Sequence, residues 1–395
     1  MAALAMLGPF SIDMIFPGFP AIARGFGASD VAMQQIVSVY LAAYAALSLF
    51  QGAISDAFGR KPVIVAGTLA YALASAGCAA SSSLGLLLLS RAGQGLCAGV
   101  GMIVGRAIIR DLFEGVAAHR LMSQVTVIFG IAPAIAPIVG ALLLGWTGWR
   151  GIFWALTAFA TLLTLGCAVF LPESHPPERR RPFTLGPLWT SYRQIATDSP
   201  FAFLALAAAM NFGGLFLYIA SAPAFVLKLL ELSPAGFPWL FVPLIGGITL
   251  GAWVSGRLAG RLPLAQIVTF GYGTMASANL ANVAVSSLLP HPAVPWSVLP
   301  LSLDALGFSL AAPALTLLAL DRFPDQRGAA SSVQACLALV TNALLAGLAS
   351  PLLSGSAQEL AAGMFALTLL GYGGWLAYCK QSKTINSIPT PLVQA

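Results

Sequence analysis

The stretch QGAISDAFGRKP, Gln51 to Pro62, separates two long apolar runs and holds one carboxylate, two cations and two glycines in twelve residues. A tight loop between two membrane spans needs glycine for a left-handed turn, and it keeps its charges outside the hydrocarbon. Asp56 is placed to cap the helix that follows or to pair with Arg60 and Lys61. Two interpretations stay open: a turn anchored by its cations, or a conformational latch whose charge-assisted hydrogen bonds form in one state and break in another.

The composition on both sides of this loop indicates a membrane protein. Of 395 residues, 58% are hydrophobic and 8% are charged, whereas about 25% charge is usual in a soluble domain. The first apolar run has no basic leader and continues past Ile22, so we expect a span rather than a cleavable targeting segment. The net charge of +6 does not indicate nucleic acid, because the basic residues stand at the ends of apolar runs. The five cysteines lie in or beside such runs, and their spacing predicts neither disulfides nor a metal site.

The lengths of the apolar runs predict the fold class. A spanning helix takes about 20 apolar residues, and this length predicts six spans at 2–22, 35–55, 62–82, 87–108, 122–145 and 150–171. Six more follow at 201–222, 238–257, 264–288, 297–319, 328–351 and 360–379. We therefore expect an all-α membrane protein of two pseudo-symmetric six-helix bundles. The predicted domains are the bundles 1–171 and 201–380, a cytoplasmic linker at 172–200 and a cytoplasmic tail at 381–395.

The basic residues and an internal repeat support this division. Lys and Arg collect on the cytoplasmic side of membrane proteins. With both termini cytoplasmic, fifteen of the nineteen lie inside, three lie outside and Arg91 lies within the fourth run. The motif GRKP at 59–62 recurs as GRLP at 260–263, 201 residues later, each time at the entry to the third run of its half. Two such parallel repeats build a substrate site between them near the bilayer midplane.

Three signatures resemble the major facilitator superfamily. The first is the loop between the second and third runs, with Ala57 where the family usually has a basic residue; it comprises Gly52, Asp56, Gly59, Arg60 and Lys61. The second, LLLLSRAGQGLCAGVG, is similar to the fourth-helix signature, in which a membrane-embedded arginine is associated with proton coupling; it contains Arg91, Gln94, Gly95 and Gly99. The third, GIAPAIAPIVGALLLG, resembles the fifth-helix signature of the drug-exporting branches, with Ala141 in place of a second glycine; it contains Gly130, Pro133, Pro137 and Gly140.

Further stretches are similar to one branch of that family. SIDMIFPGFPAIA with Asp13, GRAIIRDLF with Asp111, and LPES at the end of the sixth run resemble the drug:proton antiporters of the bicyclomycin and chloramphenicol exporter type. The resemblance implies twelve transmembrane helices in the bacterial cytoplasmic (inner) membrane. It also implies a substrate cavity lined by the first, fourth, seventh and tenth helices. The prolines and glycines of the third signature predict a bend and a close helix contact in the fifth run, because proline removes a backbone donor and glycine a side chain.

Three ionisable residues lie within predicted spans: Asp13, Arg91 and Asp304. Each costs about 2.5 to 3.5 kcal/mol at a helix centre unless it faces a cavity or a partner. Our hypothesis is that Asp13 is the protonatable coupling group and that Arg91 is close enough to bias its ionisation. The alternatives are a static buried pair for Asp13 with Arg91, and a wetted residue near the outer interface for Asp304. The candidate residues of the substrate cavity are Asp13, Tyr40, Gln94, Asn211, Tyr218 and Asp304; for Gln94 a bond between helices, and for Tyr40 simple packing, stay open.

The function favoured by these observations is a proton-coupled antiporter that exports small apolar or amphipathic compounds by alternating access. Its expected partners are a small-molecule substrate, protons and the lipid bilayer, with no cofactor, no nucleic acid and a monomer as the working unit. A nutrient or metabolite importer of the same fold is the alternative, and sodium stays open as the coupling ion. An enzyme is not expected, because His119, His175 and His291 all lie at or near loops. Nothing indicates a sensor domain, and no phosphate-binding loop indicates ATP-driven transport.

Overall fold

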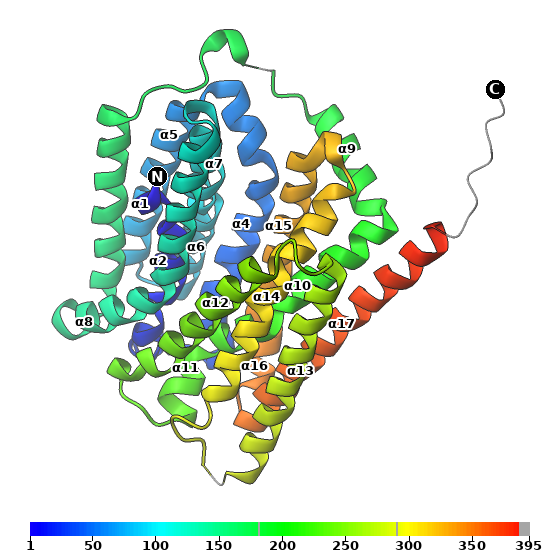
Figure 1. Ribbon diagram of the computed structural model, residues 1–395. Coiled ribbons are helices and arrows are strands. Elements are labelled where there is room, and N and C mark those ends of the chain that lie inside the picture. The colour runs from blue at the N-terminus through cyan, green and yellow to red at the C-terminus, as the bar shows by residue number, and fades with distance from the viewer. Residues whose placement is uncertain (181, 290, 387–395) are drawn as a thin grey trace.

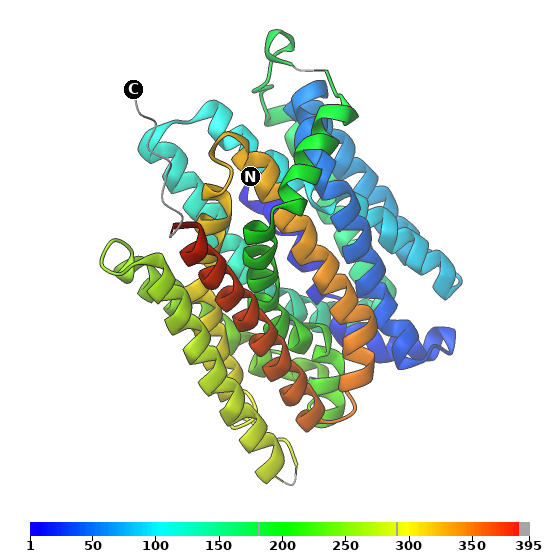
Figure 2. The same ribbon diagram turned by 90° about the vertical axis from the view of Figure 1, so that its right-hand side faces the viewer.

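The structure is a computed structural model that describes residues 1–180, 182–289 and 291–386, and within these ranges it contains helices and loops without a β-strand. Figures 1 and 2 show the linker at one end of the molecule, called here the linker end, and α11 with α16 at the opposite end, called the far end. The predicted tail at 381–395 lies mostly outside the described residues, as does Arg181.

The first bundle follows the predicted order of spans. It consists of α1 (Ala2–Ala5), α2 (Leu7–Asp13), η1 (Phe16–Gly18), α3 (Phe19–Phe26), α4 (Asp30–Phe58), α5 (Arg60–Ala79), α6 (Leu84–Ala98), α7 (Val100–Leu112) and α8 (Gly115–Phe170). The helix α4 begins where the Ser29 hydroxyl accepts a hydrogen bond from the Ala32 amide, and it ends at Gly59 with φ of 98°. Gly148, with φ of 70°, divides the long α8 into the fifth and sixth spans.

The second bundle begins after the linker. The linker contains η2 (Pro177–Arg179) and α9 (Leu185–Thr197). The bundle consists of α10 (Ser199–Ala220), α11 (Ala222–Ala224), η3 (Phe225–Leu229), η4 (Pro234–Gly236), α12 (Pro238–Leu258), α13 (Leu264–Leu288), α14 (Leu299–Asp321), η5 (Pro324–Gln326), α15 (Arg327–Leu344), η6 (Leu345–Ala349), α16 (Ser350–Leu353) and α17 (Ala357–Asn386).

Twelve spans emerge from these helices within the described residues. Ten stretches are long and apolar enough to cross a membrane, and one of them, Arg120–Phe170, contains two spans because the chain turns at Gly148. The twelfth is α13, with 25 residues; it is long enough to span, but polar residues such as Asn279 and Asn282 lower its mean hydropathy. The predicted fold class of two six-helix bundles is confirmed.

The internal repeat extends beyond the quoted motif. Gly59 and Gly260, 201 residues apart, both adopt a positive φ, of 98° and 76°, which favours glycine at the turn into the third span. Tyr71 and Tyr272 have the same spacing. The Tyr71 hydroxyl bonds to the Ser11 hydroxyl on the first span, and the Tyr272 hydroxyl donates to the Ala207 carbonyl on the seventh at 2.7 Å.

The two bundles pack together most extensively at the far end. The largest buried apolar cluster combines residues of both bundles there, including Phe16 and Phe153 of the first and Phe225 and Phe241 of the second. The cluster around Trp375 draws its buried members from α9 and the second bundle, and the cluster around Val104 lies within the first. The molecule is therefore in a conformation closed at the far end.

Hydrogen bonds and an ion pair reinforce that closure. Gln35 Nε2 donates to the Gly347 carbonyl at 3.1 Å, Ser38 Oγ donates to the Ala343 carbonyl at 2.8 Å, and Lys228 Nζ lies 2.6 Å from Asp30 Oδ2. Nearer the linker, the Tyr192 hydroxyl of α9 donates to the Leu49 carbonyl of α4 at 2.6 Å. Burial raises the pKa of Tyr192, which keeps this donor protonated.

Candidate functional site

Asp13 lies at the point where the α-helical hydrogen-bond pattern of the first span is interrupted, a point called here the break. The helix α2 ends at Asp13, and the chain continues through η1 before α3 begins. The side chain is 4% exposed, and its Oδ1 has no hydrogen-bond partner among the described residues. A buried carboxyl oxygen without a donor is costly when the group is ionised. This position therefore suits a carboxyl group that binds a proton.

The fifth-helix signature packs against this break. A Cβ atom added to Gly140 of α8 would collide with the carbonyl oxygen of Met14, the residue after Asp13. Gly130, by contrast, has no neighbour within 4 Å of such an atom. Of these two glycines, only Gly140 makes the predicted close contact. The helix continues through Pro133 and Pro137 with helical backbone angles, so the predicted bend stays a prediction.

Arg91 of α6 is fully buried and directed toward α4. Its Nε donates to the Ile36 carbonyl at 3.1 Å, its Nη1 donates to Gln94 Oε1 at 2.6 Å, and its guanidinium lies 4.4 Å from the centre of the Tyr40 ring. The cation is thus stabilised by two oxygen acceptors and an aromatic face. Tyr40, predicted as a cavity residue, packs beneath this cation and is itself buried.

A polar chain leads from Arg91 back to the first span. Gln94 Nε2 donates to Ser75 Oγ at 2.7 Å, and Ser75 Oγ donates to the Tyr71 carbonyl at 2.8 Å. The Tyr71 hydroxyl then bonds to Ser11, two residues before Asp13. In this conformation Gln94 therefore forms a hydrogen bond between helices, which was one of the two interpretations left open by the sequence.

The direct pair of Asp13 with Arg91, considered from the sequence, does not form. Among the described ion pairs none joins the two, and the contacts of Arg91 with Ile36 and Tyr40 hold its guanidinium against α4. Arg91 Nη2 has no hydrogen-bond partner among these residues. The proton-coupling roles of Asp13 and Arg91 stay predictions.

Asp304 belongs to a polar cluster inside the second bundle. Asn279 Nδ2 donates to Asp304 Oδ1 at 3.0 Å and to Thr368 Oγ1 at 2.8 Å. Asn282 Nδ2 donates to the Tyr218 hydroxyl at 3.0 Å. Asp304 is 0% exposed, which corrects the alternative of a wetted residue near the outer interface: helices α10, α13 and α17 cover it.

The six residues predicted for the substrate cavity form two separate groups. Asp13, Tyr40 and Gln94 lie in the first bundle, and Asn211, Tyr218 and Asp304 lie in the second, where Asn211 Nδ2 donates to the Phe308 carbonyl at 3.1 Å. All six are buried, so this conformation does not gather them on one open cavity. Their substrate contacts stay predictions.

The predicted latch forms a charge network at the linker end. Arg60 Nη1 lies 2.5 Å from Asp56 Oδ1, and Arg60 Nε lies 3.0 Å from Asp111 Oδ2 at the end of α7. Glu173, after the sixth span, accepts a hydrogen bond from the Arg60 amide at 3.0 Å, and Ser174 donates to Asp111 at 3.0 Å. The network ties the ends of the second, third, fourth and sixth spans together within one bundle.

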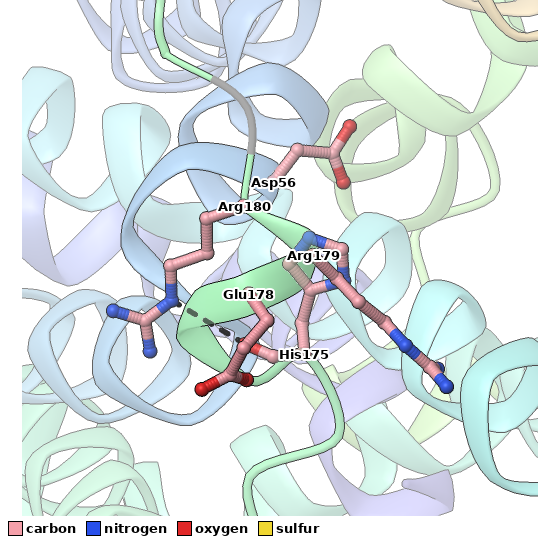
Figure 3. A pocket seen from close by; sticks show the side chains of 5 residues that line it. All are labelled: Asp56, His175, Glu178, Arg179 and Arg180. Carbon is pink, nitrogen blue, oxygen red and sulfur yellow. Dashed lines mark hydrogen bonds between the residues drawn. The ribbon is translucent and has the colours of Figure 1, made fainter.

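Glycine is favoured at the turn of this network because Gly59 adopts a φ of 98°, and an added Cβ would also displace the ends of the Arg180 and Glu173 side chains. Gly52 has open space around it. A cavity of about 600 Å³ adjoins the network and is lined by Asp56, His175, Glu178, Arg179 and Arg180. Figure 3 shows these five side chains, four of them from the linker and Asp56 from the end of α4. Whether these bonds break in another state stays a prediction.

Sequence reasoning missed most partners of the charged residues. Ser75 and Tyr71 carry the link from Gln94 to the first span, and Asn279 and Thr368 hold Asp304. The available signals were the 201-residue spacing of the two tyrosines and the asparagines in an otherwise apolar run. Such polar residues within a span indicate bonds between helices.

This architecture, with two repeated bundles and buried polar clusters in the membrane, defines a multi-pass transporter. A family model described as Major Facilitator Superfamily matches residues 1–347. The chain belongs to the major facilitator superfamily and is a transporter, not an enzyme.

Several relatives match nearly the whole chain. It is 29% identical over 394 residues to the uncharacterized MFS-type transporter YdgK of Bacillus subtilis (strain 168), covering 98% of this chain and 96% of the relative. It is 27% identical over 356 residues to Multidrug resistance protein D of Escherichia coli (strain K12), covering 89% and 88%. It is 25% identical over 362 residues to the bicyclomycin resistance protein homolog of Haemophilus influenzae, covering 88% and 87%.

Solved structures confirm the fold. The chain superposes with a TM-score of 0.71 and 17% identity on a bacterial homolog of the human lysosomal transporter Spinster, solved in an inward-facing and unoccupied conformation, covering 99% of this chain and 98% of that one.

Proposed function

We propose that this protein is a proton-coupled antiporter that exports small apolar or amphipathic compounds across the bacterial cytoplasmic membrane by alternating access. The observation that carries the proposal is Asp13, a buried carboxyl group with an unpartnered oxygen at the break in the first span. The names of two relatives, which refer to multidrug and bicyclomycin resistance, support export of such compounds.

The proposed orientation places the linker end and both termini in the cytoplasm. Basic residues of the linker, including Arg179 and Arg180, support it, because positive charge stays inside. In this orientation the far end faces outward, and the structure represents a state closed to the outside. The proposed working unit is a monomer, with a small-molecule substrate and protons as its partners and no cofactor.

The mechanism starts from the protonation of Asp13. In the conformation closed at the far end, Asp13 carries a proton, because its Oδ1 has no donor and no cation lies in an ion pair with it among the described residues. Binding of a substrate beside the broken helix then favours release of this proton toward the cytoplasm. Binding of one species and release of the other bias the two-state equilibrium of the bundles, which is how a gradient drives export.

The test is dye efflux from energised cells that express the wild type, Asp13→Asn or the matched control Asp325→Asn, an exposed aspartate of η5. We expect a protonophore to abolish wild-type efflux, Asp13→Asn to lose efflux against a gradient, and Asp325→Asn to retain it. Active export by Asp13→Asn at the wild-type rate would refute Asp13 as the coupling group. Uptake instead of efflux would favour the importer alternative.

A further inference from the structure

The polar cluster around Asp304 contains two oxygens without a donor. Asp304 Oδ1 accepts from Asn279 Nδ2 at 3.0 Å, whereas Asp304 Oδ2 and Asn279 Oδ1 have no hydrogen-bond partner among the described residues. Both atoms are only acceptors when the carboxyl group is ionised. A single proton on Asp304 Oδ2 supplies the missing donor for the cluster, since a carboxylic acid and an amide present complementary edges to one another.

The surroundings of Asp304 offer no positive charge to neutralise it. Among the described ion pairs none includes Asp304, and its bonded neighbour on α13 is uncharged. The titratable group that faces it from α10 is the Tyr218 hydroxyl, which accepts from Asn282. On α17, the Thr368 hydroxyl belongs to the cluster and accepts a hydrogen bond from Asn279. The basic residues of α12 and α15 are engaged elsewhere: Arg257 stacks on Trp253, and Arg327 pairs with Asp321.

The first bundle shows how a buried cation changes such a cluster. Gln94 of α6 bonds to Ser75 on the preceding span, as Asp304 of α14 bonds to Asn279 on its preceding span. Gln94 additionally accepts a hydrogen bond from Arg91 at 2.6 Å. In the second bundle the residue that bonds to the preceding span is a carboxyl group, and no guanidinium bonds to it among the described residues. A proton is the smallest species that neutralises this carboxyl group without moving a helix.

We infer that Asp304 and Asn279 form a second proton-binding site, in which the protonated Asp304 donates from Oδ2 to Asn279 Oδ1 in the conformation closed at the far end. The site is enclosed by α10, α13 and α17, so the proton leaves when a movement of these helices admits water. The inference does not depend on drug export. If the chain is an antiporter as proposed, each bundle carries one protonatable carboxyl group.

The experiment is infrared difference spectroscopy of the full chain in lipid vesicles, stepped between acidic and alkaline buffer. The proteins compared are the wild type, Asp13→Asn, Asp304→Asn and the double variant. We expect the carbonyl stretching band of protonated carboxylic acid to lose one component in each single variant and both components in the double variant. A difference band unchanged by Asp304→Asn would overturn the proposal, because Asp304 would then neither bind nor release a proton between the two buffers.

A second variant keeps the test decisive if Asp304→Asn does not fold. Asn279→Leu removes the acceptor of the proposed bond and keeps the carboxyl group, so the Asp304 component should move to the frequency of a weakly bonded acid. An Asp304 component that does not change frequency would contradict the bond to Asn279.

Replacing sodium with choline at fixed pH distinguishes a cation site from a proton site. A component that disappears as sodium is added would overturn the proton assignment. Because none of these readouts needs transport, failure of efflux leaves the result intact.

Discussion

The close contact between Gly140 and the broken first span can be tested by two matched substitutions in one helix. Gly140→Ala and Gly130→Ala add the same methyl group to α8, ten residues apart. At Gly130 the added atom meets no neighbour within 4 Å, and at Gly140 it collides with the backbone carbonyl of Met14. Backbone gives way less readily than a flexible side chain, so only Gly140→Ala should displace the segment that follows Asp13.

The expected magnitudes follow from these surroundings. Replacing a glycine inside a helix with alanine stabilises it by about 0.5–1 kcal/mol, and Gly130→Ala should show this gain. Overpacking at a tight contact costs about 1–3 kcal/mol, so Gly140→Ala should range from neutral to about 2 kcal/mol destabilised after the same gain. The difference between the two variants is then about 1–3 kcal/mol, the overpacking cost itself.

The assay is equilibrium unfolding in mixed micelles of increasing sodium dodecyl sulfate content, followed by the fluorescence of the tryptophans. Dye efflux is measured in parallel. Gly140→Ala should unfold at a lower detergent fraction than Gly130→Ala, and it should lose efflux because the position of Asp13 changes. Coincident unfolding curves with equal efflux would refute the reasoning, since the collision would then be relieved without consequence.

Three further predictions concern other parts of the molecule. Arg91→Lys keeps the charge but cannot reproduce the bonds to Ile36 and Gln94 together, so efflux should fall at least tenfold at unchanged expression. Arg60→Ala removes the centre of the charge network and should lower the free energy of unfolding by about 1–3 kcal/mol, measured in mixed micelles, with Arg60→Lys intermediate. Cysteines at Ser38 and Ala343, whose atoms bond at 2.8 Å, should cross-link on oxidation and block efflux until a reductant is added. Full activity of the cross-linked protein would show that the far end need not open.

The elements that the sequence predicted well depend on local rules. A span is recognised by its length of apolar residues, and the loop at Gly59 by a glycine that must adopt a positive φ. The same rules correctly predicted two spans within α8, although its hydrogen-bond pattern continues across Gly148 as if it were one helix. The pairing of Asp56 with Arg60 was also anticipated, because both lie at neighbouring span ends, whereas the bonds of Arg60 to Asp111 and Glu173 were not.

The partners of the buried charges depend on which way each helix is rotated, and this was not predictable from one sequence. Arg91 was expected near Asp13, yet it points toward α4. There the Ile36 carbonyl accepts its hydrogen bond and the Tyr40 ring stacks against its guanidinium. Asp304 was given a wetted alternative, yet α13 and α17 provide amide and hydroxyl groups for it. A span position fixes depth in the bilayer, whereas rotation is decided by contacts with neighbouring helices.

The distribution of bonds indicates which parts of the molecule move as units. The bonds that hold Arg91 all lie within the first bundle, and those that hold Asp304 all lie within the second. The bonds between the bundles at the far end are two contacts to backbone carbonyls and an exposed ion pair, and an exposed pair contributes only about 0–1 kcal/mol. Opening the far end therefore breaks few polar contacts and leaves the polar clusters around Arg91 and Asp304 intact, and its main cost is the separation of the apolar residues that the two bundles share there. Rocking of one bundle against the other is consequently a movement that the polar contacts permit, and the break at Asp13 is the place where such a movement reaches a protonatable group.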